Sequence, residues 1–290
     1  MTGTGYALCM EAPHAPGRPF ASDDHLGTAE WPVPLPAGVS RTLGIDLASQ
    51  PATTAGCVID WAVTGATVRA VLVGLDDAAV VALVNGCEKV GIDAPFGWPA
   101  PFAAFVGEQS VGQPETVPWS PGRRDALRFR QTDFVVRGVL GRWPLSVSSD
   151  LIAITAMRCA GLLASLGVGD RSGAGRVVEV YPAVALQRWS LPSSGYKGLA
   201  GRATALPNLF RALLAACPWL DVPEPVARTC AASDHALDAL VCALVARAVA
   251  IGATERPGDS EREHARVEGW IAIPTADALG RLVGSGHPAA

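Results

Sequence analysis

Five acidic residues stand in or beside apolar segments, where acids are rarely found in folded proteins. Asp46, Asp93 and Glu179 each lie within or at the end of a short apolar run that is typical of a buried strand. Asp234 and Asp238 are four residues apart near the start of an apolar helical segment, so they project from one helix face. A buried carboxylate costs several kcal/mol unless a cation, a proton or hydrogen-bond donors compensate it, so each acid needs a partner.

A site for divalent cations would compensate all of these acids if the fold brings them together. Four or five carboxylates in one place repel each other unless cations neutralise them or some of them keep protons. Hard oxygen ligands suit Mg²⁺ or Mn²⁺, and two such ions about 3.5–4 Å apart can activate water for phosphodiester cleavage. The sequence therefore predicts a metal site that draws on Asp46, Asp93, Glu179, Asp234 and Asp238.

Each acid, taken alone, also has a structural interpretation. Asp46 could cap a turn, and Asp93 could accept hydrogen bonds from the backbone amides that follow it. Glu179 could pair with Arg176 or Arg188, and Asp234 suits the start of a helix, where negative charge is favourable. The two interpretations have equal support for Asp46 and Asp93, and the structural one is favoured for any other acid by itself. The joint occurrence of the acids in this order of elements is what favours the metal site.

Hydrophobic periodicity indicates the elements that must position these acids. Strands are expected at residues 42–47, 56–61, 66–74, 89–94 and 176–181, and helices at 76–86, 148–166, 206–216 and 233–251. Residues 268–274 are expected to form a further short strand or an extended cover. Three consecutive strands followed by helix-separated strands predict an α/β fold, in which a mixed sheet carries helices on both faces.

Composition indicates how the chain is divided. Residues 1–40 are rich in proline, glycine and alanine without periodicity, so we expect a flexible extension there. Residues 41–275 are expected to form one domain, interrupted at about 97–147 by an irregular insertion rich in proline and arginine. Residues 256–265 are expected to form a charged loop, and residues 276–290 a C-terminal tail.

The insertion concentrates positive charge in an otherwise acidic chain. Its residues 123–142 place six arginines against two aspartates, Asp125 and Asp133; the arginines are Arg123, Arg124, Arg128, Arg130, Arg137 and Arg142. Arginine binds phosphate through two parallel hydrogen bonds, so this stretch could contact nucleic acid, and a solvated loop with internal ion pairs has equal support. The aromatic residues around it could stack on unpaired bases, although packing in the core is the favoured role; they are Trp98, Phe102, Trp119 and Phe129.

Composition also restricts the class of protein. The chain has 290 residues, of which 49% are hydrophobic and 17% charged, and its net charge of −4 gives no overall attraction for nucleic acid. Seven cysteines are scattered without a CxxC pair, which favours reduced thiols in the cytoplasm over disulfides or a zinc site. We expect neither a secretory signal nor a membrane span, because the chain shows no apolar run of about 18 residues.

Several segments between residues 41 and 274 resemble a family of predicted nucleases with a ribonuclease H-like core, numbered 429 among the domains of unknown function. The segments are GIDLA at 44–48, GIDAPFGWP at 91–99, RQTD at 130–133, VEVYP at 178–182, SDHALDALVCALVA at 233–246 and EGWIAIP at 268–274. The resemblance implies a five-stranded sheet in the order 3-2-1-4-5 and a divalent-metal site. It also implies that Asp46, Asp93 and Asp238 are the catalytic acids, with Glu179 and Asp234 as further candidate ligands.

These observations support three hypotheses about function. The first is a nuclease dependent on Mg²⁺ or Mn²⁺, in which the acids bind the metal and Arg123, Arg124, Arg128, Arg130 and Arg137 hold the nucleic-acid backbone. The second is an ATP-binding phosphotransferase of the actin-like or sugar-kinase type, because GIDLASQPATTAG resembles a phosphate-binding hairpin. The third is a non-catalytic module that binds nucleic acid without metal and in a salt-sensitive way.

Overall fold

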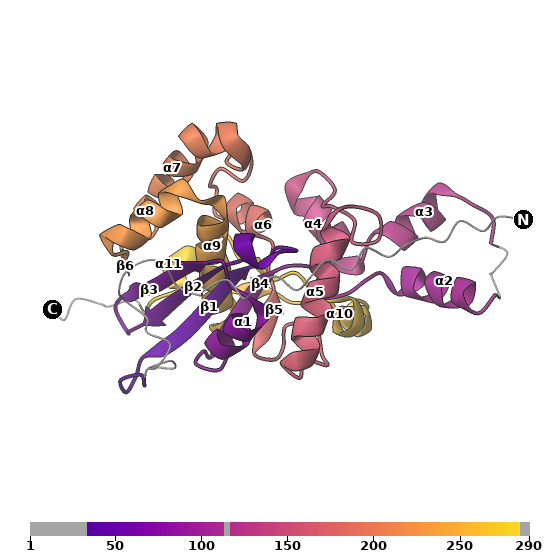
Figure 1. The fold of residues 1–290 in the computed structure, drawn as a ribbon, viewed down its shortest axis with the longest axis horizontal. Helices are drawn as coiled ribbons and strands as arrows, with labels where there is room; N and C mark the ends of the chain where they lie inside the picture. Colours follow the sequence, from indigo (N-terminus) through magenta and orange to yellow (C-terminus); the bar gives the residue numbers. More distant parts are fainter. Residues whose placement is uncertain (1–33, 113–116, 285–290) are drawn as a thin grey trace, which may run out of the picture.

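A mixed sheet of six strands forms the centre of the computed structural model, which describes residues 34–112 and 117–284 (Figure 1). Its strands lie in the order β5-β4-β1-β2-β3-β6. Their bounds are β1 Ser40–Asp46, β2 Ala55–Trp61, β3 Ala66–Val73, β4 Lys89–Asp93, β5 Val177–Glu179 and β6 Leu220–Asp221. The expected extension falls outside the described residues up to position 33, and its last residue, Ser40, opens β1.

The first three strands form an antiparallel meander, as their alternating pattern and short connections predict. The turn between β1 and β2 contains a short 3₁₀ helix, Pro51–Thr53. β4 pairs with β1 in parallel, β5 with β4 in parallel, and β6 with β3 in parallel. A sixth strand, β6, is therefore added to the five expected strands at the β3 edge. It is only two residues long, which is too short to show a hydrophobic pattern of its own.

Helices cover both faces of the sheet. On one face lies α9, Asp234–Ala250, whose side chains are buried almost all the way round because it packs between the strands and other helices. The opposite face is covered by α1, Asp77–Val84, and α5, Ile152–Ser165, which share a core with β1 and β4. The α/β architecture expected from the sequence is confirmed.

Two glycines allow α9 to lie directly against the sheet. A Cβ atom at Gly44 in β1 would overlap the carbonyl oxygen of Ala239, and one at Gly91 in β4 would overlap that of Cys242. Both glycines precede the Ile-Asp pairs of the two GID motifs. The motif glycines therefore set the distance between the helix that carries Asp238 and the strands that carry the other acids.

The insertion between β4 and α5 is helical, so the expectation of an irregular stretch was wrong. It contains α2 Ala100–Ser110, α3 Pro121–Arg128 and α4 Gln131–Leu140. α2 buries none of its residues and α3 buries only Leu127, so neither helix has the apolar stripe that periodicity detects. Proline in the first turn of α2 and α3 begins these helices rather than breaking them. Both project away from the sheet, and we call residues 100–112 and 117–128 the arm (Figure 1).

The remaining helices also extend beyond what periodicity indicated. α7, Gly198–Ala216, begins earlier than expected, and α6 Pro182–Arg188 and α8 Glu224–Ala232 start at proline-containing turns. α10, Arg262–Glu268, begins within the expected charged loop and runs past its end. The expected tail contains α11, Ala278–Arg281, which is followed by Leu282 in the core. A small second sheet pairs β7 Thr254–Glu255 with β8 Ile273–Pro274.

Within the described part of the chain, no single helix combines the length and apolar character needed to cross a membrane. α8 and α9 meet that test only when taken together, and they are bent by 114° at their junction.

Candidate metal centre

Three of the five predicted acids meet at one end of the sheet. Asp46 is the last residue of β1 and Asp93 the last residue of β4, and the two are partners in the parallel register of these strands. Asp238 lies in the second turn of α9 and faces them. One oxygen atom from each carboxylate lies within 4.8 Å of the others. The structure thus brings together the three acids that were expected to be catalytic.

Local sequence explains the position of Asp238. The Ser233 side chain accepts a hydrogen bond from the backbone N–H of Ala236 at 3.3 Å, so it caps α9. Asp238 follows one turn later, on the helix that packs against β1 and β4. Because Gly44 and Gly91 bring this helix close, the Asp238 carboxylate reaches the ends of the strands.

Burial and mutual repulsion make the ionised forms of these acids unfavourable. Burial raises the pKa of Asp238 to about 6, and the negative charge of Asp46 contributes further to this increase. The pKa of Asp93 is also raised, first by burial and then by the charges of Asp46 and Asp238. A nearby ammonium group opposes both increases in pKa, and it belongs to Lys197.

Lys197 and Tyr196 contact Asp238 from the loop that precedes α7. The Lys197 Nζ atom lies 2.5 Å from Oδ2 of Asp238, and the Tyr196 hydroxyl donates to Oδ1 at 2.8 Å. Tyr196 is buried, whereas 56% of the Lys197 side chain is exposed. Gly195 and Gly198, on either side of the pair, have positive φ angles of 81° and 76°. We call residues 195–198 the GYKG loop.

His235 contacts Asp46, the acid at the end of β1. Its Nδ1 atom lies 2.6 Å from Oδ2 of Asp46, and the hydrogen bond to this carboxylate raises the pKa of the imidazole. The histidine follows Asp234 on α9 and is half-buried beside the three acids. It therefore holds one oxygen of Asp46 in a fixed direction.

Asp234 lies outside the group of three acids and positions the GYKG loop instead. Its carboxylate accepts hydrogen bonds from the Arg202 guanidinium at 2.9 Å and from the backbone N–H of Gly198. These contacts lower the pKa of Asp234 although burial opposes them. By fastening Gly198 and the first turn of α7 to α9, Asp234 places Lys197 beside Asp238.

Glu179 is also separate from the group of three, because buried donors bind it. Its carboxylate accepts from Arg130 at 2.8 and 2.9 Å and from the backbone N–H of Phe96 at 2.9 Å. Arg130 is only 3% exposed and also pairs with Asp133 at 2.9 Å. Burial raises the pKa of Glu179, and the Arg130 charge counteracts this. The arginine partner comes from the insertion, so the expectation that Glu179 pairs with Arg176 or Arg188 was wrong.

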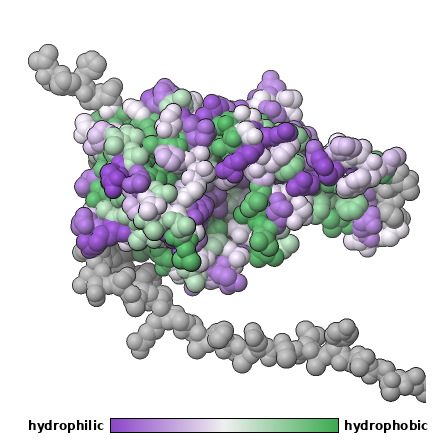
Figure 2. Space-filling view, turned by 90° about the horizontal axis from the view of Figure 1, so that it is seen from above, coloured by the Kyte–Doolittle hydropathy of each residue, from purple (hydrophilic) through white to green (hydrophobic). Residues whose placement is uncertain are grey.

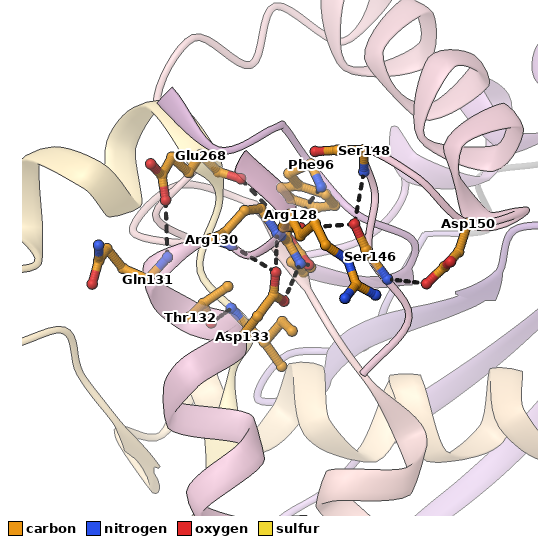
Figure 3. A network of polar contacts seen from close by, with 12 residues as sticks. Phe96, Arg128, Arg130, Gln131, Thr132, Asp133, Ser146, Ser148, Asp150 and Glu268 are labelled. Carbon is orange, nitrogen blue, oxygen red and sulfur yellow. Dashed lines mark hydrogen bonds and ion pairs between the residues drawn. The ribbon is translucent and has the colours of Figure 1, made fainter. Parts of the chain in front are cut away.

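Glu268 completes this network at the base of the arm. Its two carboxylate oxygens accept from the backbone N–H of Ala100 at 2.8 Å and of Gln131 at 3.0 Å. These are the first residues of α2 and α4, whose N–H groups have no partner within their own helices. One buried acid thus joins two helix N-termini, and Figure 3 shows it beside Arg130.

The structure divides the predicted phosphate-contacting arginines into two groups. Arg130 is buried in the network above and cannot reach a phosphate without breaking its ion pairs. Arg124 pairs with Asp125 at the surface. Arg128 lies over the Phe129 ring at 4.8 Å and Arg137 over the Trp143 ring at 4.2 Å. Together with Arg123, these side chains lie on or beside the arm.

The aromatic residues of the insertion are used mainly for packing. Phe129 and Trp143 stack in parallel with their ring centroids 3.9 Å apart, and Phe129 is buried. Trp98 and Phe102 are half-buried. Trp119 is 72% exposed, so it remains available for stacking on a base.

The donor set fits a hard divalent cation. The three acids offer only oxygen, and neighbouring oxygen ligands of Mg²⁺ at about 2.1 Å lie roughly 3 Å apart, so modest side-chain movement closes the 4.8 Å group. A bound cation stabilises carboxylates that repel each other, because it favours their ionised forms. The arrangement can therefore hold a divalent cation at the end of β1 and β4.

Three residues of the site, Lys197, Tyr196 and His235, were not predicted from the sequence. The GYKG segment is only a weak glycine-rich motif by itself, and nothing local connects it to Asp238. The histidines lack the spacing of metal ligands, although the position of His235 next to Asp234 places it at the same helix end. Two glycines around a Tyr-Lys pair were the available signal for a tight loop.

Comparison with known proteins gives one assignment. Neither the curated proteins nor the solved structures provide a match to this chain. A family model described as a protein of unknown function, DUF429, matches residues 44–262, which is most of the chain and includes all three clustered acids. The chain therefore belongs to the DUF429 family.

Proposed function

We propose that the protein is a nuclease that hydrolyses phosphodiester bonds in nucleic acid with a divalent cation, Mg²⁺ or Mn²⁺. The observation that carries this proposal is the convergence of Asp46, Asp93 and Asp238 on one small volume. Acids held in such a position without full compensation are typical of a functional site rather than of a structural one.

Asp46, Asp93 and Asp238 would hold the cation, and a bound cation of this kind supplies Lewis-acid activation of water and of a phosphate oxygen. The protein's own groups do the rest. His235 directs one oxygen of Asp46, and Tyr196 directs one oxygen of Asp238. Asp46 and Asp238 are buried away from bulk water, which strengthens their interaction with a cation, whereas Asp93 is half-buried.

We also propose that the sheet is of the ribonuclease H-like type. Its order contains the run β3-β2-β1-β4-β5, to which β6 is added at one edge. The clustered acids lie at the ends of two central parallel strands and on the last long helix, which supports this classification.

The arm and its arginines would contact the sugar-phosphate backbone. The chain leaves β4 at Asp93 and enters the arm seven residues later, and the charge of Glu179, in the network at the base of the arm, acts on Asp93. Arg123, Arg124 and Arg128 provide positive charge on the arm and Arg137 on the adjoining α4, while Arg130 fixes the base of the arm from the interior.

The proposal is tested by incubating the protein with labelled DNA and RNA oligonucleotides, single- and double-stranded, with Mn²⁺ and with chelator. We expect cleavage only with Mn²⁺, and Asp93→Asn should reduce it at least about a hundredfold because it removes a ligand. Asp221→Asn, an exposed aspartate of β6, is the matched control and should cleave like the wild type. Cleavage that survives in Asp93→Asn, or none with any substrate, would contradict the proposal.

A further inference from the structure

The GYKG loop places a positive charge of the protein itself beside the three acids that would bind a divalent cation. The Lys197 ammonium is 2.5 Å from Oδ2 of Asp238 and also interacts with Asp93 and Asp46. It therefore partly compensates the three acids.

The two oxygens of Asp238 are held differently. Oδ1 accepts a hydrogen bond from the buried, neutral Tyr196 hydroxyl, which can persist when a cation is present. Oδ2 is paired with Lys197, so this oxygen must exchange the ammonium for the cation before it can become a ligand.

The Lys197 ammonium can move away from Asp238 into solvent, whereas the Asp238 carboxylate stays buried. The lysine side chain is 56% exposed, so its ammonium can return to water at small cost, while Asp238 is 1% exposed and would remain unpaired. An unpaired buried carboxylate is costly, so departure of the lysine is favourable only when another positive charge replaces it.

The loop is built to hold this lysine in place. Gly195 and Gly198 adopt left-handed backbone conformations on either side of it, and Asp234 binds the Gly198 backbone. Gly201, in the first turn of α7, packs so closely on the loop that a Cβ atom there would overlap the backbone of Gly195 and Tyr196.

We propose that Lys197 is a tethered competitor of the divalent cation: it occupies Oδ2 of Asp238 and is displaced when the cation binds. This inference rests on the proposed metal site. It makes Lys197 a positioning residue that keeps the three acids together before a cation arrives and weakens the binding of that cation.

The test is calorimetric titration of Mn²⁺ into the full-length protein without nucleic acid. Lys197→Met should bind Mn²⁺ about tenfold more tightly than the wild type or better, because no ammonium has to be displaced. Arg211→Met, which removes an equal charge from the exposed side of α7, is the matched control and should bind like the wild type. Lys197→Arg, which keeps the charge, should also stay close to the wild type.

Thermal unfolding keeps the test valid if Lys197→Met is poorly folded. Without metal, this variant should unfold at a lower temperature than the wild type. Mn²⁺ should raise its unfolding temperature by more than it raises that of the wild type. If Lys197→Met binds Mn²⁺ no more tightly than the wild type does, the competition is overturned. The metal site itself would stand, because the wild type would still bind Mn²⁺. Absence of Mn²⁺ binding to wild type and variant alike would overturn the metal site and the competition together.

Discussion

At the scale of single residues, the acids of the candidate metal centre differ in what compensates them. Glu179 has Arg130 and a backbone amide, and Asp234 has Arg202 and a backbone amide. Asp238 is paired instead with the exposed Lys197 ammonium, and Asp46 with the partly exposed His235. This difference in compensation separates the structural acids from the functional ones, and it depends on partners distant in sequence.

The raised pKa of Asp238 predicts how stability depends on pH in the absence of metal. The folded state binds the proton of Asp238 more tightly than the unfolded state, with a pKa of about 6 against 3.8. Ionisation therefore disfavours folding, and the free energy of unfolding should fall as pH rises from about 4 to about 6, by at most about 3 kcal/mol. His235 acts in the same direction at higher pH, because its raised pKa adds stability that disappears as the imidazole deprotonates.

Urea unfolding at several pH values, in chelator, measures this effect. The quantity to compare is the difference in unfolding free energy between the wild type and Asp238→Asn, because all other titrating groups are shared. We expect the wild type to become less stable relative to the variant between pH 4 and pH 6. A difference that does not change with pH, or that changes in the opposite direction, would show that the pKa of Asp238 is not raised.

At the scale of elements, the close approach of α9 to the two central strands brings the acids together. A side chain at Gly44 has no space, because the Ala239 carbonyl occupies it. We expect Gly44→Ala to lower the free energy of unfolding by about 2 kcal/mol or more, because the helix must move away from β1. The same displacement should weaken Mn²⁺ binding, since Asp238 moves with the helix.

Gly107→Ala is the matched control for this change. Gly107 lies in α2, where an added Cβ atom meets nothing within 4 Å. Alanine is favoured over glycine in a helix, so this variant should gain about 0.5–1 kcal/mol. Denaturant unfolding of both variants checks the prediction, and similar changes in the two would contradict the close packing of α9 on β1.

Sequence patterns predict the elements with strong periodicity and miss those without it. The strands β1–β5 and the helix α9 are recognisable because apolar residues alternate along the strands and fill the helix. The helices of the arm are not recognisable from the sequence, because α2 buries none of its residues and its first turn depends on Glu268, which is far along the chain. Likewise, the three clustered acids stand out through their apolar surroundings, whereas Lys197 and His235 become visible only through their contacts in space.

At the scale of the whole molecule, an arm whose helix α3 carries three arginines extends from an acidic protein. The net charge is −4, so attraction for nucleic acid must be local. Figure 2 shows the arm narrowing away from the main body, over which hydrophilic and hydrophobic residues are mixed. A nucleic acid bound across the candidate metal centre could therefore contact the arm with its backbone.

Replacing Arg124 and Arg128 together by glutamine should weaken nucleic-acid binding without affecting Mn²⁺ affinity. For each arginine that neutralises a phosphate in the wild type, the slope of log affinity against log salt should fall by about one. Fluorescence anisotropy over a series of salt concentrations measures both the affinity and the slope. Replacing Arg211 and Arg228, exposed arginines of α7 and α8, is the control, and an equal decrease in affinity with the control pair would contradict a role for the arm.

The central claim is that Asp46, Asp93 and Asp238 share a divalent cation, and anomalous diffraction from a crystal soaked in Mn²⁺ tests it most directly. We expect a manganese peak with an oxygen of each of the three carboxylates within about 2.5 Å. We also expect that the Lys197 ammonium no longer lies on Asp238. A peak elsewhere, or none at a concentration that saturates binding in solution, would contradict the claim.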